Sequence, residues 1–211
     1  MTLSQVDLEA SPPHISIPKR YNAALELLAR NAAWPDKAAY VDSATGQTLR
    51  YGELNAQAHR FAHALIDQGF EPEQRILLCM LDTLEWPVVF LGCILAGVVP
   101  IAVNTLLTTQ DFDYMLRDSR AKGLLVSEAL LPAFQPLIGQ IPTLKTVMVS
   151  GGGNALPYLN VSAMVAQASH APFEPDTQSD AACFWLYSSG STGSPKGTVH
   201  LHSHLIQTAV L

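Results

Sequence analysis

Residues 181–197, with the sequence AACFWLYSSGSTGSPKG, join an apolar run to a loop rich in hydroxyls and glycines. The apolar part, residues 181–186, has the length and composition of a buried β-strand. The loop that follows contains three glycines and one lysine. Glycines accept positive φ, so backbone N–H groups can turn toward one point, while hydroxyl and ammonium groups add donors for phosphate oxygens. The stretch therefore predicts a strand that leads into a nucleotide-phosphate loop.

Two other phosphate-binding motifs do not fit this loop. A Walker A loop requires Ser or Thr directly after its lysine, but Lys196 is followed by Gly197. The dinucleotide pattern G-x-G-x-x-G is also absent. A Ser- and Gly-rich surface linker is the simplest alternative, but linkers seldom lie between two strongly apolar segments.

Several blocks resemble one enzyme family. Residues 189–197, SGSTGSPKG, resemble the signature loop of the AMP-forming acyl-CoA synthetases, which are adenylate-forming enzymes. Upstream, residues 51–54 (YGEL) and 96–104 (AGVVPIAVN) resemble two further blocks of that family. Residues 82–108 and 184–189 look most like the benzoate and hydroxybenzoate CoA ligases. The resemblance covers roughly residues 20–211.

The resemblance implies an α/β fold, the N-terminal part of the family's large domain, with mixed and parallel sheets flanked by helices. It implies an ATP-dependent carboxylic acid–CoA ligase that acts through an acyl-adenylate, with an aromatic acid such as benzoate as the substrate. The small-molecule partners would be the carboxylate, ATP with Mg²⁺, and CoA as co-substrate. Positioning and neutralisation of charge would supply most of the catalysis in the first step.

The resemblance also assigns site residues. The ATP phosphates would be bound by the following positions: Ser188, Ser189, Gly190, Ser191, Thr192, Gly193, Lys196 and Gly197. None of these is expected to act as a general acid or base, so no catalytic residue is placed in this segment. His202 matches a position where relatives often carry histidine, which leaves two interpretations open: a substrate contact, or a packing or capping residue. His200, His202 and His204 alternate, but a turn from strand to helix is expected here, so we predict no metal site.

Composition excludes several classes of protein. The chain has 211 residues, of which 48% are hydrophobic and 14% charged, with a formal net charge of −6. It can bury a large core, and its charge disfavours a nucleic-acid or anionic-membrane partner. Three cysteines in apolar runs indicate buried free thiols in a reducing compartment. Because no basic segment precedes an apolar stretch at the N-terminus, we expect a cytoplasmic protein.

Residues 86–103 carry no charge and could be taken for a membrane span. Pro87, Gly92, Gly97 and Pro100 interrupt the run, and Pro100 would break a spanning helix. A buried helix over 84–96 and a buried strand over 98–103 explain the same composition. A small membrane protein is the weaker alternative.

Helix and strand patterns alternate along the chain, which supports the α/β class. Asn22 is expected to cap a first helix, a second is expected to run from Tyr51 to a C-terminal Gly69, and Thr108 with Asp111 forms a capping box. Further strands are expected at 37–41, 75–80, 123–126 and 145–149. The apolar residues 130–138 favour a helix despite Pro132 and Pro136.

We expect residues 1–18 to be a flexible tail and residues 19–211 to be part of an AMP-binding domain. Leu205 and Ala209 lie at helical spacing near the end of the sequence, with no stop signal after them. This pattern predicts that the chain continues into the family's remaining motifs and C-terminal domain. The segment alone would then be inactive and poorly soluble. The competing hypothesis is a nucleotide-binding module that is complete at 211 residues and has no catalytic activity. The sequence does not indicate an oligomeric state.

Overall fold

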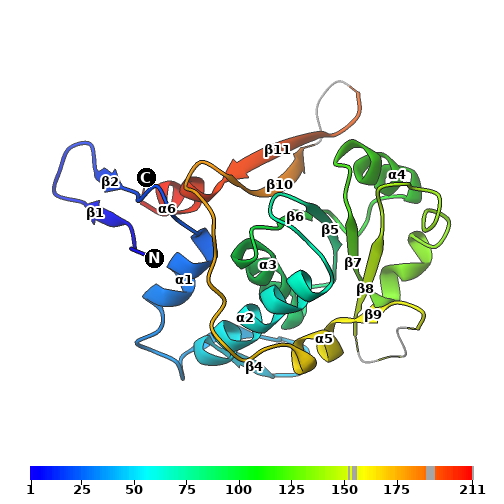
Figure 1. Ribbon diagram of the computed structural model, residues 1–211, viewed down its shortest axis with the longest axis horizontal. Coiled ribbons are helices and arrows are strands. Elements are labelled where there is room, and N and C mark those ends of the chain that lie inside the picture. Colours follow the sequence, from blue (N-terminus) through cyan, green and yellow to red (C-terminus); the bar gives the residue numbers. More distant parts are fainter. Residues whose placement is uncertain (152, 154–155, 189–192, 211) are drawn as a thin grey trace.

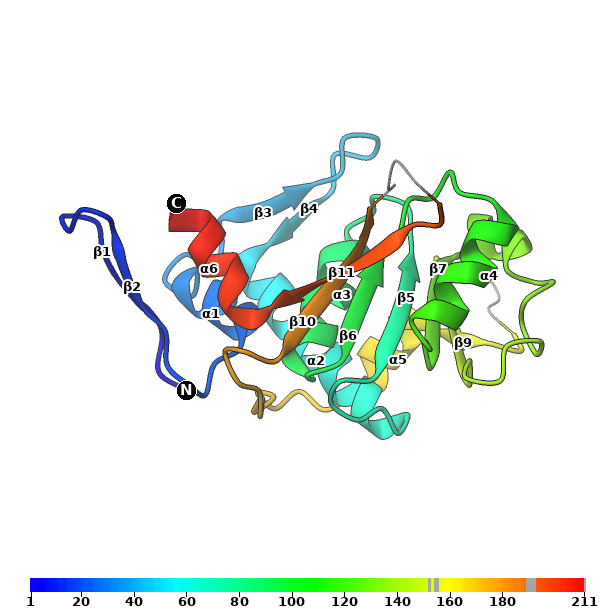
Figure 2. The ribbon, with the colours of Figure 1, turned by 90° about the horizontal axis from the view of Figure 1, so that it is seen from above.

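The computed structural model describes residues 1–151, 153, 156–188 and 193–210. Its centre is a seven-stranded sheet with the order β11-β10-β6-β5-β7-β8-β9 (Figures 1 and 2). The strands are β5 (Arg75–Cys79), β6 (Val99–Ala102), β7 (Gly123–Ser127), β8 (Thr146–Ser150), β9 (Leu159–Asn160), β10 (Ala182–Ser188) and β11 (Lys196–Leu201). All neighbouring pairs are parallel except β10 with β11, which is antiparallel. The predicted α/β class, a mostly parallel sheet flanked by helices, is confirmed.

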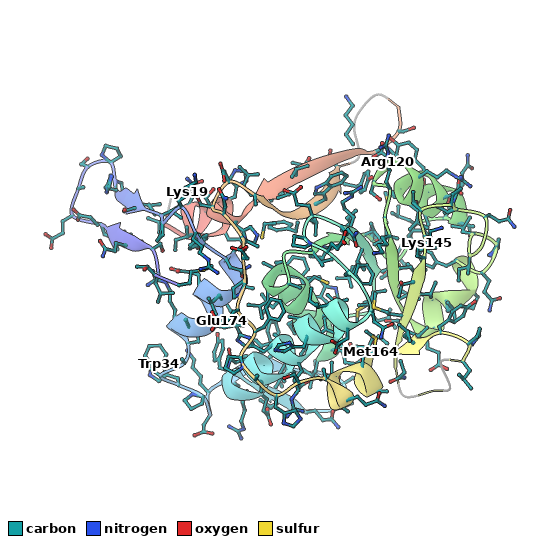
Figure 3. The ribbon with its side chains drawn as sticks, in the orientation of Figure 1. Lys19, Trp34, Arg120, Lys145, Met164 and Glu174 are labelled. Atoms are coloured by element: carbon teal, nitrogen blue, oxygen red, sulfur yellow. The ribbon has the colours of Figure 1, made fainter. Side chains whose placement is uncertain are left out.

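Each face of the sheet has its own core. One face is covered by α1 (Ala23–Arg30), α2 (Tyr51–Asp67), α3 (Glu85–Leu95) and α5 (Val161–Gln167), and the other by α4 (Thr109–Asp118) and the 3₁₀ helix η1 (Glu128–Ala133). On β5, Ile76 and Leu78 pack into the first core, whereas Leu77 and Cys79 pack into the second. This alternation follows from the two-residue period of a strand, and burial on both faces explains the continuous apolar run. Figure 3 shows side chains filling both layers.

The uncharged stretch 86–103 forms the predicted buried helix and strand, α3 and β6. Nearly all of α3 is buried, because it packs between the sheet, α1 and α2. Gly92 permits the close approach of α2: a Cβ built there would lie 2.8 Å from Cδ1 of Phe61. In the part of the chain that the structure describes, no helix has both the length and the apolar character that a membrane crossing requires.

Most predicted helix ends are confirmed. Asn22 caps α1 by accepting the N–H of Leu25 at 3.0 Å, and Thr108 and Asp111 form the capping box of α4. Gly69, with φ of 75°, follows α2 as expected. The prediction for residues 130–138 was wrong in type and extent, because only η1 forms there and it contains Pro132. Proline lacks the N–H that a longer α-helix would need.

The N-terminal stretch contains a short antiparallel pair, β1 (Gln5–Asp7) and β2 (His14–Ser16), which extends away from the main body (Figures 1 and 2). Its base is attached to α1, since Ser4 Oγ donates to the Glu26 carboxylate at 2.6 Å and Arg30 bonds to both residues. Flexibility of residues 1–18 stays a prediction. A second small sheet pairs β3 (Ala38–Val41) with β4 (Thr48–Arg50), and α6 (His202–Val210) follows β11.

Candidate functional site

A β-hairpin carries the predicted phosphate loop. β10 and β11 pair from Ala182↔Leu201 to Ser188↔Lys196, and the predicted loop joins their ends. β10 runs parallel to β6, with Trp185 opposite Ile101 and Leu186 opposite Ala102. The loop therefore leaves the sheet at the carboxyl end of the parallel strands, the edge where α/β proteins bind ligands.

Four predicted phosphate-binding residues, Ser189, Gly190, Ser191 and Thr192, lie outside the described residues. The other four, Ser188, Gly193, Lys196 and Gly197, are all exposed at the end of the hairpin. Ser188 Oγ lies 3.5 Å from the carbonyl oxygen of Lys196, across the last strand pair. The hairpin thus brings a hydroxyl and an ammonium group to the two ends of one loop.

Gly193 has a backbone conformation that favours glycine. Its φ is 91°, and a Cβ built there would meet no atom within 4 Å. The requirement for glycine is therefore conformational, because L side chains rarely adopt this region. This agrees with the role that the sequence assigns to it, a position where the backbone turns.

Gly197 has a different reason to be glycine. A Cβ there would lie 3.2 Å from the Trp185 ring and 3.6 Å from the Tyr187 ring. The absence of a side chain lets both rings lie along the stem of the hairpin. Both rings pack against the core beneath α4.

β10 is less buried than its apolar sequence predicted. Cys183 and Phe184 are buried, but from Trp185 onward the strand alternates, and Leu186 is 42% exposed. The reason is position: β11 is the edge of the sheet, and only Trp185 and Leu186 of β10 pair with β6. Among the described residues, Trp185 Nε1 is the one buried side-chain polar atom without a hydrogen-bond partner.

Tyr187 connects the stem to α4. Its hydroxyl donates to Oδ2 of Asp118 at 2.7 Å, and the carbonyl oxygen of Met115 lies 3.4 Å away. Burial, followed by the Asp118 carboxylate, raises the pKa of Tyr187, so the phenol keeps its proton at neutral pH. Asp118 belongs to no motif in the sequence. The available signal is an acidic residue at the C-terminal end of a helix, where the helix dipole disfavours it.

His202 lies at the other end of the hairpin. It is the first residue of α6, is 1% exposed, and its Nδ1 accepts the N–H of Ala23 at 3.1 Å. This contact supplies an acceptor at the N-terminus of α1, which is the capping role considered from the sequence. About six strand residues, roughly 20 Å at 3.3 Å each, separate His202 from the loop stem along β11. A substrate contact stays a prediction.

The alternating histidines do not converge on one point: the rings of His200 and His204 meet edge-on with centroids 5.9 Å apart, whereas His202 is turned toward α1. His200 lies on β11 and stacks on Phe184 at 4.5 Å, while His204 belongs to α6 and its Nδ1 accepts the N–H of Leu201. The described residues contain no group of three or more His, Cys, Asp or Glu side chains arranged for a metal ion.

The three cysteines, Cys79, Cys93 and Cys183, are buried and free, as predicted. Burial raises the pKa of each thiol, that of Cys79 to about 12. They therefore stay protonated at neutral pH and are poor nucleophiles.

A separate hollow of about 440 Å³ opens beyond the carboxyl ends of β5, β7 and β8. Its lining includes the carboxylates of Asp42, Glu85 and Glu128, which disfavour a polyphosphate. Glu85 already accepts hydrogen bonds from the hydroxyls of Ser150 and Ser162. The hairpin is therefore the better candidate for an anion such as ATP.

Comparison with known proteins agrees with the hairpin motif. The chain is 48% identical over 213 aligned residues to a benzoate–CoA ligase of Thauera aromatica, covering 100% of this chain and 40% of that protein. The crystal structure of a benzoate CoA ligase from Burkholderia xenovorans matches with a TM-score of 0.77 and 40% identity, over 90% of this chain and 36% of the other. An anthranilate CoA ligase in complex with anthranoyl-AMP matches with a TM-score of 0.85 and 29% identity, over 92% and 37% of the two chains.

The chain thus spans about two fifths of the length of these relatives. A family model described as AMP-binding enzyme matches residues 27–211, which is most of the chain and includes the whole hairpin. The chain belongs to the AMP-binding enzyme family, and benzoate–CoA ligases are among the members that it resembles.

Proposed function

We propose that this chain is the ATP-phosphate-binding part of an AMP-forming carboxylic acid–CoA ligase whose substrate is an aromatic acid of the benzoate class. The observation that carries the proposal is 48% identity to a benzoate–CoA ligase along the whole chain. The hairpin supports it, because a glycine- and hydroxyl-rich loop leaves the sheet where α/β proteins bind ligands. Residues 19–211 would form part of an N-terminal AMP-binding domain, and the buried free thiols suit the reducing cytoplasm.

In this proposal the loop binds the phosphates of ATP. Ser188, Ser189, Ser191 and Thr192 donate hydroxyl hydrogen bonds, and Lys196 neutralises charge. Gly190, Gly193 and Gly197 let the backbone approach the phosphates. Mg²⁺ would be bound through the phosphates of ATP. CoA is the second substrate.

The chemistry that these groups perform is binding and charge neutralisation. A carboxylate and a polyphosphate repel each other, so donors and cations that hold both anions lower the barrier to attack on the α-phosphate. No described side chain of the hairpin needs to move a proton. The residues that bind the acid are not assigned in this segment.

The decisive test uses the full-length polypeptide that contains this segment. We expect pyrophosphate release with benzoate and ATP, with 4-hydroxybenzoate and a long-chain fatty acid as comparison substrates. Thr192→Ala removes a hydroxyl contact to a charged phosphate, which is worth about 1.5–3 kcal/mol, so the Kd for Mg-ATP should rise about tenfold or more. Gly193→Ala should have a similar effect, since φ at this position is 91°.

Ser194→Ala is the matched control. It removes an exposed hydroxyl from the same loop, and this hydroxyl has no assigned role. Unchanged Mg-ATP affinity and undiminished thioester synthesis in the Thr192 and Gly193 variants would refute the assignment of the loop. Residues 1–211 alone should form no acyl-adenylate, and robust aryl-CoA synthesis by this segment would contradict that expectation.

A further inference from the structure

The tip of the hairpin has little support from the sheet. β10 pairs with β6 at Trp185 and Leu186, and β11 is an edge strand whose first four residues are exposed. In Figures 1 and 2 the far end of the hairpin extends past the body of the sheet toward α4. A two-stranded hairpin is marginally stable by itself, so contacts outside the sheet must hold its direction.

One such contact is the hydrogen bond from Tyr187 to Asp118. Tyr187 is one residue before the last strand pair, Ser188↔Lys196, so its side chain acts next to the start of the loop. The 2.7 Å distance to Oδ2 of Asp118 is that of a charge-assisted O–H···O⁻ bond. In contrast, the contact across the strands from Ser188 Oγ to Lys196 O is long, at 3.5 Å.

The partner of this bond is firmly placed. α4 begins with a complete capping box, and its Phe112 stacks on Phe134 of the second core at 4.4 Å. Met115 and Leu116 are also buried. Because α4 is fixed in this way, the bond ties the exposed end of the hairpin to a capped helix that is packed into the second core.

Asp118 lies at a position where its carboxylate does not stabilise α4 itself. Asp118 is the last residue of the helix, where a carboxylate faces the negative end of the helix dipole. In the described residues it forms no ion pair, whereas Arg117 pairs with Asp113 at 3.0 Å. Figure 3 labels Arg120, two residues past Asp118, on the side of the molecule toward which the hairpin points.

We infer that Tyr187 and Asp118 are positioning residues for the ATP-phosphate loop: their hydrogen bond sets the direction in which the hairpin presents the loop to the nucleotide. This inference rests on the proposed function of the loop. Gly197 contributes by leaving room for the Tyr187 ring on the side that faces α4.

The test is adenylation kinetics of the full-length ligase with Tyr187→Phe, which keeps the ring and removes only the hydroxyl. We expect the KM for ATP to rise about tenfold, which corresponds to about 1.4 kcal/mol, while the KM for the acid changes little. Asp118→Leu should give the same increase, whereas Asp118→Asn, which keeps an acceptor oxygen, should restore most of the affinity. The double variant Tyr187→Phe/Asp118→Leu should be no worse than either single variant, since both remove one bond.

Tyr158→Phe is the control, because it makes the same chemical change beside β9, at the opposite edge of the sheet. Amide hydrogen exchange supplies a second readout: Tyr187→Phe should speed exchange in residues 186–198 and leave β5 and β7 unchanged. An unaltered KM for ATP together with unaltered exchange in Tyr187→Phe would overturn the inference. If the wild-type enzyme binds Mg-ATP and responds to Thr192→Ala but not to Tyr187→Phe, the positioning role fails and the loop assignment stands.

Discussion

Protonation of His202 should weaken the folded state as the pH falls below neutrality. Its Nδ1 accepts the N–H of Ala23, and its side chain is almost completely buried. Burial lowers its pKa from 6.5 to about 4. A protonated imidazole carries hydrogens on both nitrogens, so it cannot accept this hydrogen bond, and its charge would be buried without a partner.

The sign and size follow from proton linkage. The unfolded chain binds a proton at His202 near pH 6.5, whereas the folded chain resists it until about pH 4. The contribution of this group is therefore complete above pH 6.5 and is lost progressively as the pH falls toward 4. The pKa difference, at about 1.4 kcal/mol per unit, gives a total loss of about 3 kcal/mol, of which about 2 kcal/mol is already lost at pH 5.

Exchange of the imidazole C2–H with deuterium, followed by mass spectrometry, measures this pKa in a protein of any size. The midpoint for the peptide that contains His202 should lie near pH 4 in the native protein and near 6.5 in urea. The variant His202→Asn keeps a neutral acceptor and should make the urea midpoint less dependent on pH between 7 and 5 than in the wild type. His59, whose pKa burial also lowers, is present in both proteins and cancels in this comparison. A native midpoint close to 6.5 would refute the reasoning.

Three further perturbations test the packing. Gly92→Ala should destabilise the protein by about 1–3 kcal/mol in urea unfolding, because the new Cβ would lie 2.8 Å from the Phe61 ring, and Phe61→Leu in that background should recover part of the loss. Asn22→Ala should cost about 3 kcal/mol, since it leaves the carbonyl of Ile94 and the hydroxyl of Thr177 without their amide donor, whereas Asn22→Asp should retain the helix cap alone. The three cysteines should resist a thiol reagent in the native state and react in urea, because all three are buried. Rapid labelling of the native protein would show that the reagent reaches the thiols in the folded cores.

Local signals in the sequence account for most of the helices and strands. Asn22, Thr108 with Asp111, and Gly69 mark helix ends because capping and positive φ depend on residues within one turn. The same local reasoning failed at residues 130–138, where the apolar composition favoured an α-helix but Pro132 limits the chain to 3₁₀ turns. Composition also gave no sign of the β1–β2 pair, whose base depends on contacts of Ser4 with Glu26, 22 residues away.

Contacts between distant segments could not be predicted in this way. The loop motif identified the residues proposed for phosphate binding, but not what supports them: Asp118 lies 69 residues before Tyr187. His202 shows the same limit, because its partner Ala23 is 179 residues away. Spacing within a motif carries no information on such pairs, since they depend on strand order and on how helices pack over the sheet.

Strand order also explains why this loop has to be held from outside the sheet. β6 lies on one side of β5, and β7, β8 and β9 follow on the other side. β10 then pairs with β6, and β11 forms the edge of the sheet beyond it. Because β10 is parallel to β6, the loop after β10 lies at the carboxyl edge of the sheet, where α/β proteins bind ligands. The next strand, β11, pairs with β10 alone and is the edge of the sheet. Side chains alternate along β10, so Trp185 and Tyr187 point to the face covered by α4 while Leu186 is exposed. The two rings give the hairpin contacts that the sheet does not supply. β10 therefore both presents the loop and carries the side chains that anchor the hairpin. A shift of its register by one residue would turn both aromatic rings away from α4.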